Sequence, residues 1–142
     1  FQFIFVGGGT LLEELQLKSR ERNNILFTGW LEKSDVIEYY KKADSLILPS
    51  HAEGFPNVIL ESLNYRLPII STNVGAISES VIDGYNGFLI EVEDKNSLYD
   101  SILKLGSSNE LRQKFSLNSE KILFENHSIE NNCQKIFNIF NI

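Results

Sequence analysis

The sequence has no methionine, one cysteine, three prolines and one tryptophan among its 142 residues. The single cysteine, Cys133, excludes a disulfide within the chain and is compatible with a reducing compartment. No apolar run approaches the about 18 residues that a membrane-spanning helix needs, and no stretch has the pattern of a secretory signal peptide. Because methionine is absent and Phe1 already lies in an apolar run, we expect the chain to be a piece of a longer protein.

Basic residues are also few: 13 lysines and arginines stand against 19 acidic residues, which gives a net charge of −6. This balance argues against a nucleic-acid partner and against a polybasic membrane patch. No Asp-x-Asp motif and no His/Cys/carboxylate cluster with metal-ligand spacing occurs, so the sequence implies no metal and no cofactor. The length predicts one domain with a substantial core.

Short apolar runs alternate with helical patterns along the whole chain. The runs are continuous rather than alternating, which is typical of buried strands in a parallel sheet covered on both faces. We therefore predict an α/β, Rossmann-like parallel sheet with helices on both faces and no internal domain boundary. The predicted strands are residues 3–6, 25–28, 45–48, 69–72 and 88–90, and the predicted helices follow Thr10 and Ser34 or Asp35 and span residues 57–65, 96–105, 109–123 and 128 to the end.

The stretch from residue 46 to residue 61 reads as strand, loop and helix, with Pro56 in the first turn of the helix. The first N–H groups of a helix lack internal partners and carry partial positive charge, so they favour a phosphate. Glu53 precedes the helix and Glu61 lies one to two turns inside it. Two hydroxyl acceptors flanking an anion site match the layout of a nucleoside diphosphate sugar.

Glu53 and Glu61 are separated by seven residues that read Gly-Phe-Pro-Asn-Val-Ile-Leu, and Leu-Pro-Ser comes before them. This stretch resembles the E-x7-E motif of family 4 retaining glycosyltransferases, which have the GT-B fold. The resemblance covers nearly the whole chain. It implies the C-terminal, nucleotide-sugar-binding domain (residues 1–142) without its first strand-loop-helix. The acceptor-binding N-terminal domain would lie outside the chain.

The resemblance also implies roles for single residues. Glu53 would be catalytic and would stabilise positive charge on the donor sugar. The N–H groups of Gly54 and Phe55 would reach sugar hydroxyls, those of Asn57 and Val58 would hold the diphosphate, and Glu61 would accept from the ribose. Phe27-Thr28-Gly29-Trp30-Leu31 matches a second family segment. That match implies that Gly29 and Leu31 are donor-binding residues, with a backbone contact to the nucleobase at Leu31.

Several other positions invite an interpretation. Gly7-Gly8-Gly9 follows a strand, but Leu12 occupies the third glycine position of a dinucleotide fingerprint, so the stretch instead resembles the glycine-rich turn of the family. The loop from Asn73 to Glu79 also resembles the family, and we expect Glu79 to cap a short turn. Arg66 stands where the family usually has a glycine, and a left-handed conformation there would cost about 1 kcal/mol.

Two expectations concern the C-terminal part of the chain. We expect His127 to begin the last helix, as a cap or a surface residue. We also expect the last helix to pack partly on the absent domain, which would leave Ile136, Phe137, Phe140 and Ile142 exposed.

The function that follows is transfer of a sugar, with retention, from a UDP- or GDP-linked donor to a glycan or lipid-linked acceptor, without a metal. The alternatives are a sugar-nucleotide epimerase with a GT-B-like fold, a glycoside hydrolase using the two carboxylates, and a non-catalytic nucleotide-binding module. The Asn-, Ile-, Lys- and Phe-rich composition suggests a bacterial source. We expect a cytoplasmic enzyme that works at the inner face of the membrane when its acceptor is lipid-linked.

Overall fold

The computed structural model describes residues 1–140, apart from the side chain of Phe140. The chain divides into two compact units, Phe1–Lys42 and Ala43 onward. All β-strand pairs between named strands are parallel in this part of the chain. The prediction of a parallel α/β fold is therefore confirmed, but the strands form two sheets instead of the one continuous sheet expected.

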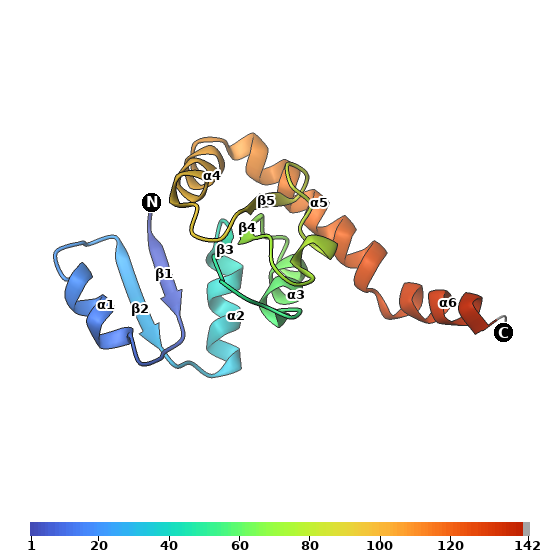
Figure 1. Ribbon diagram of the computed structural model, residues 1–142, viewed down its shortest axis with the longest axis horizontal. Coiled ribbons are helices and arrows are strands. Elements are labelled where there is room, and N and C mark those ends of the chain that lie inside the picture. Colours follow the sequence, from blue (N-terminus) through green and yellow to red (C-terminus); the bar gives the residue numbers. More distant parts are fainter. Residues whose placement is uncertain (141–142) are drawn as a thin grey trace. The chain divides into compact units, whose positions relative to one another are not determined.

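The first unit is a two-stranded sheet with two helices (Figure 1). Strand β1 (Phe3–Val6) pairs with β2 (Ile25–Gly29), helix α1 (Leu12–Ser19) connects them, and helix α2 (Lys33–Lys42) follows. The predicted caps are wrong. Helix α1 starts after Leu11 with no side-chain cap, and α2 starts before Ser34. No residue of this unit is buried.

The second unit contains a three-stranded sheet in the order β3-β4-β5. Its central strand β4 is fully buried, so the sheet has helices on both faces. The elements in chain order are β3 (Leu46–Leu48), α3 (Asn57–Asn64), β4 (Ile69–Thr72), the 3-10 turn η1 (Ile77–Glu79), β5 (Gly87–Ile90), α4 (Lys95–Ser107), α5 (Asn109–His127) and α6 (Ile129–Phe140).

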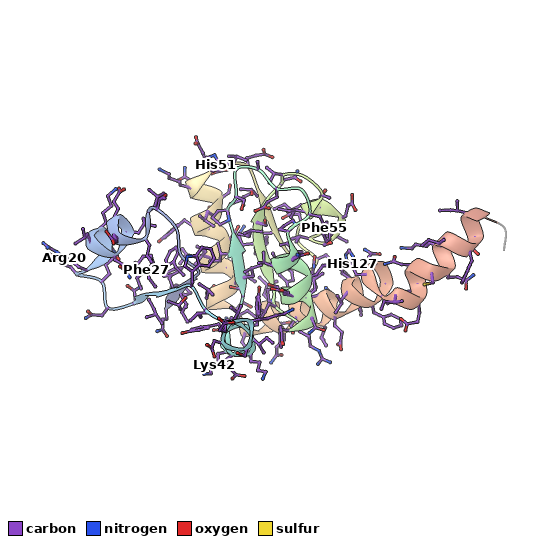
Figure 2. All side chains as sticks on the ribbon, turned by 90° about the horizontal axis from the view of Figure 1, so that it is seen from below. Arg20, Phe27, Lys42, His51, Phe55 and His127 are labelled. Carbon is purple, nitrogen blue, oxygen red and sulfur yellow. The ribbon has the colours of Figure 1, made fainter. Side chains whose placement is uncertain are left out.

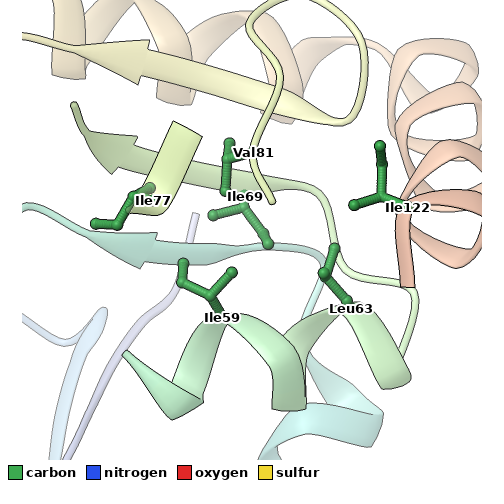
Figure 3. Packing of buried hydrophobic residues seen from close by; sticks show 6 residues of the cluster. All are labelled: Ile59, Leu63, Ile69, Ile77, Val81 and Ile122. Atoms are coloured by element: carbon green, nitrogen blue, oxygen red, sulfur yellow. The ribbon is translucent and has the colours of Figure 1, made fainter. Parts of the chain in front are cut away.

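Two hydrophobic clusters lie on the two faces of this sheet, because successive side chains of a strand point to opposite faces. Ile69 of β4 belongs to the cluster with α3 and η1, which Figure 3 shows. Ile70, the next residue, packs in the other cluster with Leu105 of α4. Helix α5 reaches both, through Ile122 in the first and Phe115 in the second. The sheet and helix α3 are thus held from both sides.

Helix α3 ends in a left-handed turn at Arg66, whose φ is 58°. The N–H of Arg66 donates to the carbonyl of Leu63, and the N–H of Leu67 donates to that of Ser62. This is the hydrogen-bond pattern of a Schellman motif, which usually has glycine at the left-handed position. The Arg66 guanidinium pairs with the Glu120 carboxylate on α5. The expected left-handed conformation is confirmed.

Helix α6 extends away from the sheet after α5 (Figure 1). Its side chains Ile136 and Phe137 are 52% and 47% exposed, as the sequence predicted. The Phe140 side chain and Ile142 lie outside the described residues. No helix in the described part of the chain is long and apolar enough to cross a membrane.

Each sheet has two edge strands that are paired on one side only. Within the described residues, these are β1 and β2 in the first sheet and β3 and β5 in the second. Each edge leaves backbone N–H and C=O groups without strand partners.

Candidate functional site

The loop from Pro49 to Pro56 joins the carboxyl end of β3 to helix α3, as the sequence predicted. Pro56 is the N-cap residue in an extended conformation, with φ −75° and ψ 123°, and Asn57 is the first helical residue. The proline therefore lies one position earlier than predicted. No side chain caps this helix, and no acidic residue lies in its first turn. The start of α3 keeps its positive partial charge and its backbone donors.

The Glu53 carboxylate is held in this loop by a neighbouring hydroxyl. Ser50 Oγ donates to Glu53 Oε1 over 2.7 Å. The carbonyl of Ser50 accepts in turn from Thr72 Oγ1 over 2.6 Å, and Thr72 is buried at the end of β4. Within the described residues, no hydrogen bond is made to the second oxygen of Glu53. One oxygen is thus fixed by the protein and the other is available to a ligand.

Glu61 lies one helical turn after Asn57 and one after Val58, and it is half-buried. Side chains on a helix tilt toward its N-terminus, so the Glu61 carboxylate leans toward the helix start. Asn57 is exposed and Val58 is half-buried. The structure thus brings Glu53, the first turn of α3 and Glu61 together on one loop-helix segment.

The loop after β4 supports the Glu53 loop by backbone contact alone. The N–H of Ala76 donates to the carbonyl of Gly54 over 2.9 Å. A Cβ atom at Gly75 would lie 2.1 Å from the Glu53 carbonyl oxygen, and the φ of Gly75 is +56°. Only glycine fits here, on grounds of space and of conformation. Glu79 caps nothing, because η1 has no side-chain cap, so that prediction is wrong.

Phe55 lies 5.7 Å from His127, measured between ring centroids, with the rings tilted by 47°. His127 ends α5 and is half-buried, so the expectation that it begins the last helix is wrong. Its Nε2 lies 2.8 Å from the hydroxyl oxygen of Ser80. Figure 2 labels both rings, one from the loop before α3 and one from the end of α5.

Gly29 and Leu31 belong to the first unit, whereas the residues from Glu53 to Glu61 belong to the second. Gly29 ends β2 with a φ of +66°, and its carbonyl accepts from the N–H of Gly7 over 3.0 Å. Leu31 is half-buried and lines a shallow pocket of about 300 Å³ with Tyr39 and Lys42. The donor-binding roles of Gly29 and Leu31 stay predictions.

Several contacts that shape the site could not be read from the sequence. Ser50 was part of the motif, but its hydrogen bond to Glu53 depends on side-chain geometry. The contacts Thr72–Ser50 and Ser80–His127 join residues far apart in the chain. The glycine at position 75 could have been singled out, since the loop resembled the family. Within residues 1–140, no group of three or more His, Cys, Asp or Glu residues is placed to hold a metal ion.

Solved structures with similar folds identify the architecture. The Anabaena protein HepE, solved in complex with UDP, covers 99% of this chain with a TM-score of 0.84 and 20% identity, and the match spans 41% of HepE. The C-terminal domain of the glycosyl transferase group 1 family protein LpcC from Francisella tularensis covers 84% of the chain with a TM-score of 0.76 and 27% identity, over 63% of that domain structure. The fold is that of GT-B glycosyltransferases.

The family follows from the sequence comparison. The model described as glycosyl transferases group 1 matches residues 1–122, and the chain belongs to this family. A curated relative in Escherichia coli, UDP-Gal:alpha-D-GlcNAc-diphosphoundecaprenol alpha-1,3-galactosyltransferase, is 30% identical over 99% of this chain and 33% of its own length. The chain spans about a third of the length of the curated relatives it matches.

Proposed function

We propose that the chain is the donor-binding domain of a family 4 retaining glycosyltransferase. The whole enzyme transfers a sugar from a nucleoside diphosphate sugar to a glycan or lipid-linked acceptor. The observation that carries the proposal is the uncapped start of α3 between Glu53 and Glu61. Membership in the glycosyl transferases group 1 family supports it.

The diphosphate binds at the N–H groups of Asn57 and Val58, because no protein side chain satisfies the start of α3. Glu61 accepts hydrogen bonds from the ribose diol, one turn away on the same helix. The backbone of Leu31, after the turn at Gly29, contacts the nucleobase. No lysine or metal ion is needed at this segment to hold the phosphates, so we expect activity without a divalent cation.

Glu53 is the proposed catalytic residue. Its carboxylate, oriented by Ser50, faces the donor sugar and stabilises the positive charge that develops on the ring as the bond to the leaving diphosphate breaks. Such an effect is strongest when the charged group is already in place before the reaction. The N–H groups of Gly54 and Phe55 hold sugar hydroxyls and keep the anomeric carbon near Glu53.

We further propose that a strand-loop-helix belongs before β1 in the whole protein, with an acceptor-binding domain before that. In the strand order 3-2-1-4-5-6 of doubly wound sheets, the first strand pairs with both the second and the fourth. If β1 is the second strand, the upstream strand would pair with β1 and cover one open edge of the two-stranded sheet.

A curated relative supports a proposal for the acceptor and for the site of action. The printed name of the Escherichia coli relative specifies a UDP-galactose donor and a diphosphoundecaprenol-linked acceptor. We propose an acceptor of the same chemical kind, a polyprenyl-diphosphate-linked sugar. We place the enzyme in the cytoplasm, at the inner face of the membrane that holds such lipids.

The test is product analysis with the full-length protein that contains this chain. Purified enzyme is incubated with UDP-galactose, UDP-N-acetylglucosamine or GDP-mannose, with and without a diphosphoundecaprenol-linked sugar, in buffer with EDTA. Transfer that requires acceptor and yields the anomeric configuration of the donor supports the proposal. Glu53→Gln is expected to lower kcat by about a hundredfold, whereas Glu125→Gln, an exposed α5 change, serves as the matched control.

Other products identify the alternatives. Free sugar without acceptor indicates a hydrolase, and an epimerised donor without acceptor indicates an epimerase. Binding of a sugar nucleotide with no turnover indicates a non-catalytic module. Activity that EDTA abolishes and a divalent cation restores would overturn the metal-free part of the proposal.

A further inference from the structure

We propose that His127 is a positioning residue that holds Phe55, and with it the sugar-binding part of the loop, in place. This inference rests on the proposed donor site. It assigns a role to the end of helix α5, which lies about seventy residues after that loop in the sequence.

Phe55 needs such support because its loop has no regular structure. Its side chain is 38% exposed, so it is only partly held by packing. Among the described residues, His127 is the aromatic neighbour of its ring. A shift of the Phe55 side chain would move its own N–H and that of Gly54, the two donors assigned to the sugar hydroxyls.

His127 is itself fixed to a rigid part of the second unit. Its Nε2 lies 2.8 Å from the hydroxyl oxygen of Ser80, and Ser80 is fully buried. The carbonyl of Ser80 accepts from Asn86 Nδ2 over 2.9 Å, and the Oδ1 atom of Asn86 accepts from the N–H of Ile82 over 2.7 Å. The imidazole therefore links the Phe55 ring to a buried hydrogen-bond network.

The protonation state of the His127 ring affects how well the ring supports Phe55. Burial lowers the pKa of His127 below 6.5, Lys135 on α6 lowers it further, and Glu79 on η1 acts in the opposite direction. The folded protein thus favours the neutral ring. Protonation places a charge in a partly desolvated position near Lys135, so it destabilises this position of the ring. The ring supports the loop fully above pH 6.5 and loses this role as the pH falls through its lowered pKa.

The experiment measures donor affinity of the full-length protein by calorimetry, with UDP-galactose as the first probe, at pH 7.5 and at pH 5.5. Both phosphates of this ligand are esterified, so its charge is the same at the two pH values. If the wild type does not bind it, the sugar nucleotide used in the product assay replaces it. The variants are His127→Ala and His127→Phe, with the exposed Lys121→Ala on the same helix as the control.

His127→Ala is expected to weaken donor binding about three- to tenfold at pH 7.5, the range that an aromatic pair typically contributes, and to raise KM with kcat changed less than about twofold. His127→Phe keeps a ring against Phe55 but cannot titrate. It is expected to bind donor more tightly than His127→Ala at pH 7.5 but less tightly than the wild type, because it lacks the contact with Ser80. It is also expected to lack the weakening that protonation of His127 causes in the wild type as the pH falls.

Two results would overturn the inference while leaving the proposed function intact. One is a wild type that binds donor, together with a His127→Ala variant of the same affinity. The other is a His127→Phe variant with the same pH dependence as the wild type. A thermal melt of each variant identifies a general loss of folding. If His127→Ala does not fold, the donor affinity of His127→Phe and its pH dependence test the inference. Failure of the wild type to bind any sugar nucleotide would instead refute the donor site itself.

Discussion

The Ser50 hydroxyl donates a hydrogen bond to Glu53, with Oγ and Oε1 2.7 Å apart. A hydrogen bond to a charged group is worth about 1.5–3 kcal/mol, and about 1.4 kcal/mol corresponds to a factor of ten in rate. We expect Ser50→Ala to lower kcat about tenfold or more with little change in donor KM. Steady-state kinetics of the full-length enzyme measures this effect.

The control for Ser50 is Ser116→Ala, a half-buried serine on α5 away from the loop. It removes a hydroxyl without touching Glu53 and is expected to leave kcat unchanged. Equal kcat values for the wild type and Ser50→Ala would show that the bond does not position the carboxylate for catalysis.

Gly75→Ala is expected to damage the Glu53 loop. The added Cβ would overlap the Glu53 carbonyl oxygen at 2.1 Å, and a left-handed alanine costs about 1–2 kcal/mol. Because small misplacements of binding groups have large effects, we expect donor binding to weaken at least about tenfold. Calorimetry with a sugar nucleotide measures the loss.

The variant Gly84→Ala separates the effect of backbone strain from the effect of an overlap with Glu53. Gly84 has a similar φ of +69°, but no atom lies within 4 Å of its hypothetical Cβ. This variant should lower thermal stability through backbone strain alone and keep donor affinity. If both variants bind donor equally well, the contact between Gly75 and Glu53 has no role in the site.

Arg66 allows a prediction about stability alone. Its left-handed φ of 58° disfavours a side chain, while its pair with Glu120 is exposed and contributes little. We expect Arg66→Gly to be more stable than Arg66→Ala by about 1 kcal/mol, because both lose the ion pair and only glycine relieves the strain. Thermal melts of the two variants compare them directly, and a more stable alanine variant would contradict the interpretation.

Asp94 caps helix α4, where its Oδ1 accepts from the N–H of Ser97 over 3.0 Å and its Oδ2 from the Ser97 hydroxyl over 2.6 Å. The Ser97 hydroxyl, and then its N–H, lower the pKa of Asp94 below 3.8. A lowered pKa means that this stabilisation is complete above pH 3.8 and is lost as the pH falls through the folded value.

Asp94→Asn keeps a capping side chain but does not titrate. We expect the stability difference between the wild type and this variant, measured by urea unfolding, to favour the wild type more at pH 6 than at pH 3. A difference that does not vary with pH would show that the Asp94 charge has no part in the cap.

The sequence predicted the strands well because each is a short uninterrupted apolar run, as at Ile69 and Ile70. It also located the segment from Glu53 to Glu61, since a strand, a loop and a helix start are local features. Helix starts were less certain. Thr10 and Glu13 have the spacing of a capping box, but α1 starts after Leu11 and leaves the box unformed.

Contacts across the fold could not be predicted in the same way. Nothing in the sequence around Ser80 and His127 indicates that their side chains meet, because 47 residues separate them. The two separate sheets also escaped prediction, since a run such as Phe3–Val6 shows that a strand forms but not which strand pairs with it.

The unpaired strand edges have a practical consequence for anyone who produces residues 1–142 alone. An open strand edge is a template for another chain, and the described residues leave four of them, at β1, β2, β3 and β5. We expect such a preparation to form oligomers by edge-to-edge pairing as its concentration rises.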